Sequence, residues 1–128
     1  ENNRVIIHIM WLSSMVLLLN HLLACLWFAI GKTAHSDTKV RWTDLEWQRG
    51  DREGSTALLD MPLEFQYTTA FHWAIAQITL GANEINSTNT NERIMQIACL
   101  LLGLVCGSSF ISSLSAAIFE YHAAREDK

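Results

Sequence analysis

The chain has 128 residues, half of them apolar, and a formal net charge of −4 at pH 7. This length allows one domain at most. The acidic balance argues against nucleic acid as a partner, because binding nucleic acid requires a basic surface. The chain begins without Met and with polar residues, so we expect neither a signal peptide nor a natural start, but a segment of a longer protein.

Residues 4–30 form an apolar run with one charge at its edge. A helix needs about 20 apolar residues to cross a bilayer, so this run is predicted to be a membrane-spanning outer helix. Trp27 and Phe28 near its far end are expected at the membrane interface. Polar side chains inside the run indicate either hydrogen bonds to a neighbouring helix, which we favour, or a proton relay. They are His8, Asn20 and His21.

Residues 31–64 hold most of the charges and lack a clear hydrophobic period. They are too polar for the membrane and are predicted to form an extracellular cap, with short helical turns around residues 42–49. Pro62 suits the first turn of the helix that follows.

Residues 65–78 form a mostly apolar helix that is too short to cross a bilayer. It lies between two longer apolar runs, and the next residues, 79–84, turn polar. A short helix and irregular backbone held between two spanning helices are typical of a re-entrant loop that lines a water-filled path. The sequence therefore predicts the pore loop of a cation channel.

Residues 92–120 are predicted to form a second spanning, inner helix. Asn91 is expected to be its N-cap, and Glu92 suits the first turn. Four residues recur at every fourth position, three of them small or hydroxyl-bearing, which places them on one face. This stripe indicates either close packing against another helix or, as we favour, lining of a wet pathway. It consists of Gly103, Gly107, Ile111 and Ser115.

The three cysteines lie in the apolar runs and lack the paired spacings of a disulfide framework or a metal site. Cys25, Cys99 and Cys106 are therefore expected to be buried, small apolar residues. Neither enzyme activity nor a cofactor is predicted, because the sequence has no nucleophile elbow, paired metal ligands or glycine-rich phosphate loop. The glycosylation acceptor at Asn86 lies so close to the predicted pore loop that crowding argues against its modification.

Two blocks of the sequence resemble the pore of ether-à-go-go type potassium channels and their cyclic-nucleotide-gated relatives. Residues 20–31, NHLLACLWFAIG, are similar to the family's outer-helix pattern H-W-x-A-C-x-W/Y-Y-A-I-G. Residues 69–97, TAFHWAIAQITLGANEINSTNTNERIMQI, are similar to its T-A-L-Y-F-x-x-x-x-L-T-S-V-G-F-G-N and N-T-N-x-E-K-I patterns. The resemblance implies a voltage-gated-like, all-α membrane protein over residues 1–128. Two transmembrane helices would flank a re-entrant pore helix and filter loop, assembled as a homotetramer.

The resemblance also implies the site. The family's selectivity filter falls on Thr79, Leu80, Gly81, Ala82, Asn83 and Glu84. Backbone carbonyls of that segment replace the hydration shell of the ion in potassium channels, so residues 79–81 are implied to hold a permeant monovalent cation. Ala82 replaces the family's filter aromatic, and Asn83 replaces its second glycine. Asn tolerates φ > 0 better than most residues, so Asn83 can hold a left-handed turn.

These departures favour a pore that is weakly selective among monovalent cations and passes potassium and sodium, with calcium as a further candidate. Glu84 would add a ring of carboxylates near the mouth. The alternatives are a potassium-selective pore of the same family and a non-conducting membrane scaffold, whose helices would serve as packing surfaces. We expect a multi-pass protein of the plasma membrane, with cations, identical subunits and the lipid bilayer as its partners.

Overall fold

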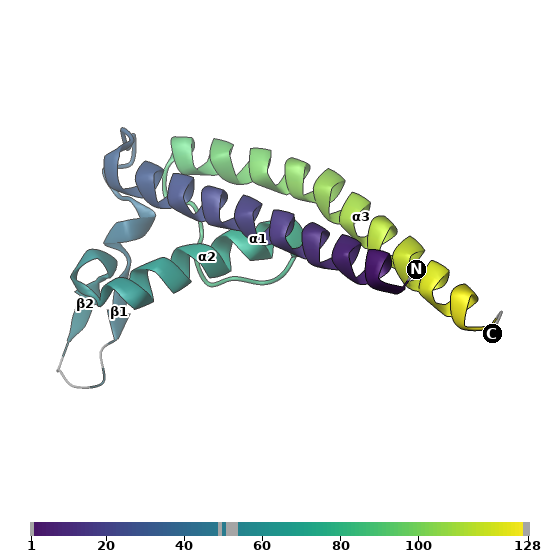
Figure 1. Cartoon of the computed structure of the whole chain (residues 1–128). Coiled ribbons are helices and arrows are strands. Elements are labelled where there is room, and N and C mark those ends of the chain that lie inside the picture. The colour runs from purple at the N-terminus through teal and green to yellow at the C-terminus, as the bar shows by residue number, and fades with distance from the viewer. Residues whose placement is uncertain (1, 49, 51–53, 127–128) are drawn as a thin grey trace.

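The structure is a computed structural model that describes residues 2–48, 50 and 54–126. Three helices dominate it: α1 (Asn2–Thr33), α2 (Leu63–Thr79) and α3 (Thr90–Glu126). α1 and α3 run in opposite directions, so both ends of the chain lie at one end of the molecule, and α2 packs on both helices at the other end (Figure 1). The predicted mostly helical architecture is confirmed.

Helices α1 and α3 are long and apolar enough to cross a membrane. At about 1.5 Å per residue, both exceed the hydrocarbon core of about 30 Å. Only 17% of the most apolar window of α1 and 11% of that of α3 are buried within the chain. The apolar side chains of both helices therefore face outward, unlike those of a helix in a soluble core.

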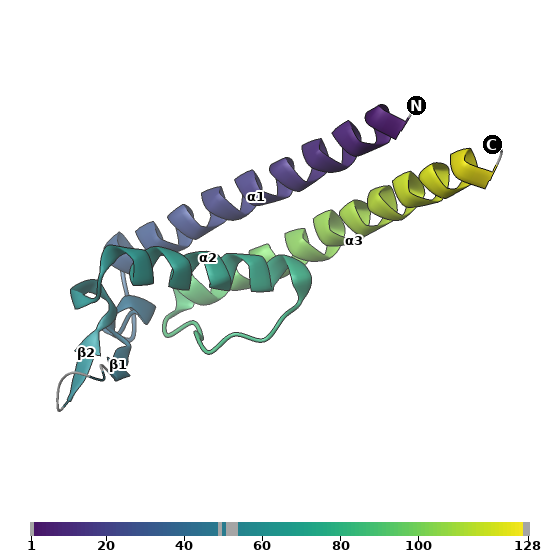
Figure 2. The same ribbon diagram turned by 60° about the horizontal axis from the view of Figure 1, so that its bottom comes forward.

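The segment between α1 and α2 contains a hairpin that the sequence did not predict. β1 (Glu46–Gln48) pairs antiparallel with β2 (Ser55–Ala57), flanked by short 3-10 turns at Trp42–Asp44 and Leu58–Asp60. The hairpin extends away from the helices (Figures 1 and 2). Helical turns were expected around residues 42–49; this is correct for 42–44 and wrong for 46–48, while residue 49 lies outside the described residues. Strands of three residues are too short to show an alternating pattern.

Three tryptophans from three segments form the centre of the core. Trp27 of α1 stacks on Trp73 of α2 with ring centroids 3.7 Å apart and an interplanar angle of 2°. Trp27 also stacks on Trp42, at 5.4 Å and 13°. All three side chains are fully buried. Trp27 thus packs against two other indoles within the chain, and its place at the membrane interface stays a prediction.

Candidate functional site

The carboxyl end of α2 carries the residues that the sequence predicts as a filter. Thr79 is the last helical residue, and Leu80 follows with φ 54° and ψ 33°, in the left-handed region. The N–H of Gly81 donates to the carbonyl of Ala76 at 2.9 Å and closes the helix. Glycine is usual at the left-handed position of such an end, because a side chain costs about 1–2 kcal/mol there.

Asn83 is not the left-handed residue of this segment. Among the described residues other than glycine, only Lys39 and Leu80 have positive φ. The side-chain Oδ1 of Asn83 accepts the N–H of Ile85 at 2.9 Å instead, and Ile85 is buried. An asparagine that bonds its own backbone two residues on forms a turn without φ > 0. Asn83 is half-buried, whereas the rest of the segment is exposed: Thr79, Leu80, Gly81, Ala82 and Glu84.

Helix α3 crosses the carboxyl end of α2 at two glycines, both buried. A Cβ at Gly103 would overlap the carbonyl oxygen of Gln77, and one at Gly107 would lie 2.8 Å from the carbonyl oxygen of Ile78. These are backbone atoms, which cannot move aside unless a helix shifts. Close helix packing, one of the two alternatives for the stripe, therefore describes these glycines, and a pore-lining role stays a prediction. Ile111 and Ser115 are exposed.

This contact fixes the level along α3 at which α2 ends. Residues 103–107 lie about 20–26 Å along α3 from its first residue, at about 1.5 Å per residue. Residues 80–89 then run back to the start of α3 (Figure 2). The exposed residues after Thr79 therefore begin beside the middle part of a membrane-length helix.

A buried carboxylate joins the cap to the start of α3. Glu92 is fully buried, and its Oε1 accepts the N–H of Trp42 at 3.0 Å. Its Oε2 accepts the N–H of Thr88 at 2.8 Å and the hydroxyl of the same residue at 2.9 Å. Glu92 lies in the first turn, as predicted. Its burial was not predicted, because an acidic residue before an apolar run usually indicates an exposed helix start.

The N-cap of α3 is Asn89, whose Oδ1 accepts the N–H of Glu92 at 3.0 Å. The prediction of Asn91 is wrong, because its side chain donates to a carbonyl of the cap instead, at 2.7 Å. Asp37 binds the same helix start: its carboxylate accepts the N–H of Thr90 at 3.0 Å and the hydroxyl at 2.6 Å. These hydrogen bonds hold the pKa of Asp37 below its ordinary value of 3.8, and the bond from the Thr90 hydroxyl has a larger effect than the bond from the Thr90 N–H.

The polar residues of α1 differ in their contacts. Nδ1 of His21 lies 2.8 Å from the hydroxyl of Tyr67 on α2, which confirms the predicted hydrogen bond to a neighbouring helix. Asn20 is fully buried, but its Nδ2 donates to Val16 of its own helix at 2.9 Å. The expected bond between helices is therefore wrong for Asn20, because a carbonyl one turn back lies within reach.

The cysteines also differ from one another. Cys99 is buried and Cys106 is half-buried, which agrees with small apolar roles. Cys25 is exposed, so the expectation that all three are buried is wrong. The exposed thiol lies on the wall of a groove between α1 and α2.

Cation binding here would depend on oxygen atoms. Within residues 2–48, 50 and 54–126, no group of three or more His, Cys, Asp or Glu side chains could hold a metal ion. Residues 79–84 instead present backbone carbonyls and the hydroxyl of Thr79, which donates to Ile75 at 2.9 Å. A hydroxyl that donates its hydrogen keeps lone pairs that can face a cation. Oxygen ligands of this kind suit hard cations.

No protein-family profile matches the chain. Its distant homologues are voltage-gated potassium channels, which supports the channel superfamily that the sequence indicates. In particular, the chain is 30% identical over 105 residues to the voltage-gated inwardly rectifying potassium channel KCNH2 of Canis lupus familiaris, covering 79% of this chain and 9% of that protein. It is 30% identical over 106 residues to KCNH6 of Gallus gallus, with coverages of 79% and 9%. It is 29% identical over 106 residues to KCNH6 of Homo sapiens, covering 79% of this chain and 11% of that protein.

The chain therefore spans 9–11% of the length of these curated relatives. The channel homologues and the two membrane-length helices together indicate a membrane protein. Relatives that are channels rather than enzymes are consistent with a chain that does not catalyse a reaction.

Proposed function

We propose that four copies of this chain form the ion-conducting pore of a multi-pass plasma-membrane protein, with α2 as a re-entrant pore helix and residues 79–84 as its filter. The observation that carries this proposal is the depth at which α2 ends. Its last turn packs on α3 at Gly103 and Gly107, and a run of exposed residues begins there. Unpaired backbone at that depth cannot face lipid, because each unsatisfied group costs several kcal/mol in hydrocarbon. A water-filled path shared with neighbouring copies would solvate it.

The proposed pore is weakly selective among monovalent cations. Ala82 carries no large ring to brace the width of the filter, and the Asn83 side chain is engaged with the backbone of Ile85. The left-handed residue is Leu80, the second of the six. These features support a filter that is shorter and softer than a regular row of carbonyl rings. Exposed Glu84 carboxylates near the mouth would attract cations.

A potassium-selective pore is the second candidate, because the relatives named above are potassium channels. The carbonyls of residues 79–81 would then supply the inner ion sites, and Glu84 would lie outside them.

Bi-ionic recordings from the full-length protein in planar bilayers distinguish the two candidates. With potassium on one side and sodium on the other, weak selectivity gives a reversal potential close to zero, and the double substitution Ala82→Tyr, Asn83→Gly shifts it toward the potassium equilibrium. The matched control, Ser109→Ala, changes an exposed side chain of α3 outside the segment and leaves the reversal potential unchanged. A strong potassium preference in the unmodified protein favours the second candidate. A stable monomer without current refutes the pore itself.

A further inference from the structure

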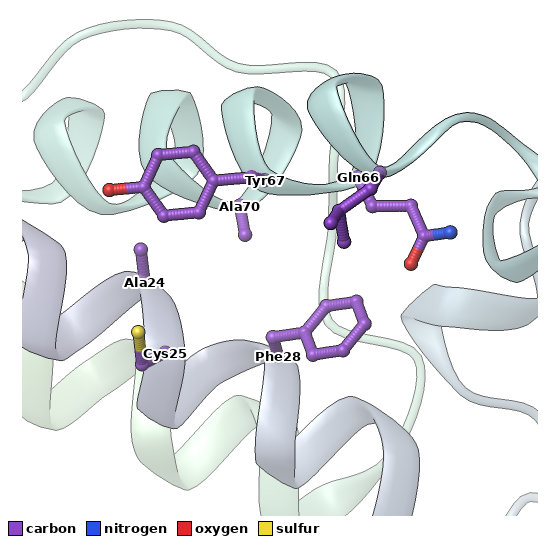
Figure 3. Close-up of a pocket in the computed structure, with 7 residues that line it drawn as sticks. Ala24, Cys25, Phe28, Gln66, Tyr67 and Ala70 are labelled. Carbon is purple, nitrogen blue, oxygen red and sulfur yellow. The ribbon is translucent and has the colours of Figure 1, made fainter.

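An apolar cavity of about 180 Å³ lies between α1 and α2 (Figure 3). Ala24, Cys25 and Phe28 of α1 form one wall, and Tyr67 and Ala70 of α2 form the other. The thiol of Cys25 points from α1 toward α2, and the Tyr67 ring covers the same end of the cavity. A cavity of roughly 150 Å³ holds a molecule as large as benzene, so this one has room for a small lipophilic compound.

The thiol of Cys25 is the end of a chain of three polar groups. The hydroxyl of Tyr67 lies 2.8 Å from Nδ1 of His21, and Nε2 of the same imidazole lies 3.7 Å from the sulfur of Cys25. A neutral imidazole has one N–H and one lone pair. In the tautomer whose Nδ1–H donates to Tyr67, the lone pair of Nε2 faces the thiol. A hydrogen bond on one ring nitrogen sets the role of the other in this way.

We propose that Cys25 is a covalent modification site for small lipophilic electrophiles, namely α,β-unsaturated carbonyl compounds with an apolar tail. The sulfur attacks the β-carbon, and an S–C bond forms as the S–H proton moves to Nε2 of His21. The electron pair of the C=C bond moves to the α-carbon and carbonyl oxygen as an enolate. The imidazolium then returns its proton to the α-carbon. A saturated thioether results, His21 regains its neutral form, and no oxidant or reductant is needed.

The apolar surroundings explain why the base must adjoin the thiol. A free thiolate is costly in a medium of low dielectric, so the proton has to leave while the new bond forms. His21 accepts it within the same helix, and the hydroxyl of Tyr67 accepts a hydrogen bond from the imidazolium. Tyr67 is thus a positioning residue, and the cavity holds the tail of the electrophile. Among the hydrogen bonds of the described residues, none joins Cys99 or Cys106 to a histidine.

The test uses the full-length protein in its membrane and trans-2-octenal as the probe. Peptide mass spectrometry follows adduct formation at the three cysteines, with the half-buried Cys106 as an internal reference. We expect Cys25 to react at least about tenfold faster than Cys106. The ratio of the Cys25 rate to the Cys106 rate should fall when acrolein, which has no tail, replaces octenal. Each buried methylene group of the tail increases binding to the cavity by about fourfold. Equal rates at the two cysteines, or a Cys25 protected from octenal in the membrane, would overturn the proposal.

Two substitutions separate the base from the cavity. His21→Gln should slow the Cys25 reaction by about 100-fold, the lower end of what a positioned base contributes. Tyr67→Phe keeps the ring that covers the cavity, so it should slow the reaction several-fold while the preference for octenal over acrolein stays. His72 on α2 is exposed, and among the described residues no hydrogen bond joins it to a thiol. His72→Gln therefore serves as the matched control with an unchanged rate. If His21→Gln and His72→Gln react alike, His21 is not the base and the proposal fails.

Discussion

Glu92→Gln probes the buried carboxylate that joins the cap to α3. The substitution keeps the size of the side chain but turns one oxygen into an NH₂ group, which cannot accept a hydrogen bond. Whichever way the amide turns, its NH₂ faces a backbone N–H, that of Trp42 or that of Thr88. A hydrogen bond to a charged group contributes about 1.5–3 kcal/mol, and an unpaired buried donor costs about 1–3 kcal/mol. Because these figures partly describe the same donor, we expect a loss of about 3 kcal/mol in local stability.

Amide hydrogen exchange measures this loss directly, because it reports local opening. A change of about 3 kcal/mol corresponds to exchange about 100-fold faster at Trp42 and Thr88. Glu64→Gln is the matched control, since Glu64 also lies in the first turn of a helix but is exposed. Both substitutions remove a helix-dipole interaction of about 0.3–1 kcal/mol, so their difference isolates the buried contacts. Equal exchange in the two variants would refute the role assigned to Glu92.

Three further outcomes are expected. The lowered pKa of Asp37 means that its bonds to Thr90 are at full strength above pH 3.8 and are lost as pH falls through the lowered value. Acid should therefore lower the protection of the Thr90 amide, measured as its exchange rate relative to the intrinsic rate at the same pH. Asp37→Asn should lack this acid-dependent loss of protection. Identical pH profiles for the variant and the unmodified protein would contradict the role assigned to Asp37. Gly103→Ala should lower the free energy of unfolding by about 1–3 kcal/mol or more, and lower Tm, because the new methyl group meets the backbone of α2. The control Ser108→Ala changes an exposed residue and should alter the free energy of unfolding by no more than about 0.5 kcal/mol. Equal Tm values for the two variants would count against the contact. Leu80→Gly should stabilise the fold by about 0.5–1 kcal/mol. This is the cost of a side chain in the left-handed region minus the cost of the greater entropy of glycine in the unfolded chain. A lower Tm in this variant would show that Leu80 is not left-handed.

The sequence predicted the helices and their order well, because each helix is an apolar run and neighbouring runs differ in length. Residues 65–78 were expected as a short helix, and α2 spans Leu63–Thr79. The outer and inner helices were placed at 4–30 and 92–120, and both extend further. Polar residues at their ends continue the helix past the apolar run, which hydrophobicity alone does not indicate.

The contacts that hold the site together were much harder to predict. Glu92 finds its partner Trp42 fifty positions away in the chain. Nothing near Glu92 in the sequence distinguishes a buried acid from an exposed one. Leu80 adopts φ 54°, whereas Asn83 was expected to hold the left-handed turn, so residue type pointed to the wrong position. Trp27, Trp42 and Trp73 gave no local sign that they would stack, because stacking depends on how three separate segments come together.

The described residues of the β1–β2 hairpin contact the rest of the molecule near its base, so the chain can be lengthened farther out. Trp42 is held by Glu92 before the hairpin begins, and Trp47 packs on Phe65 at 5.3 Å near its base. Farther out, no atom lies within 4 Å of a Cβ built on Gly50. A short epitope inserted at Gly50 should therefore leave the tryptophan stack undisturbed. Antibody staining of intact cells that carry this insertion would reveal on which side of the membrane the hairpin lies.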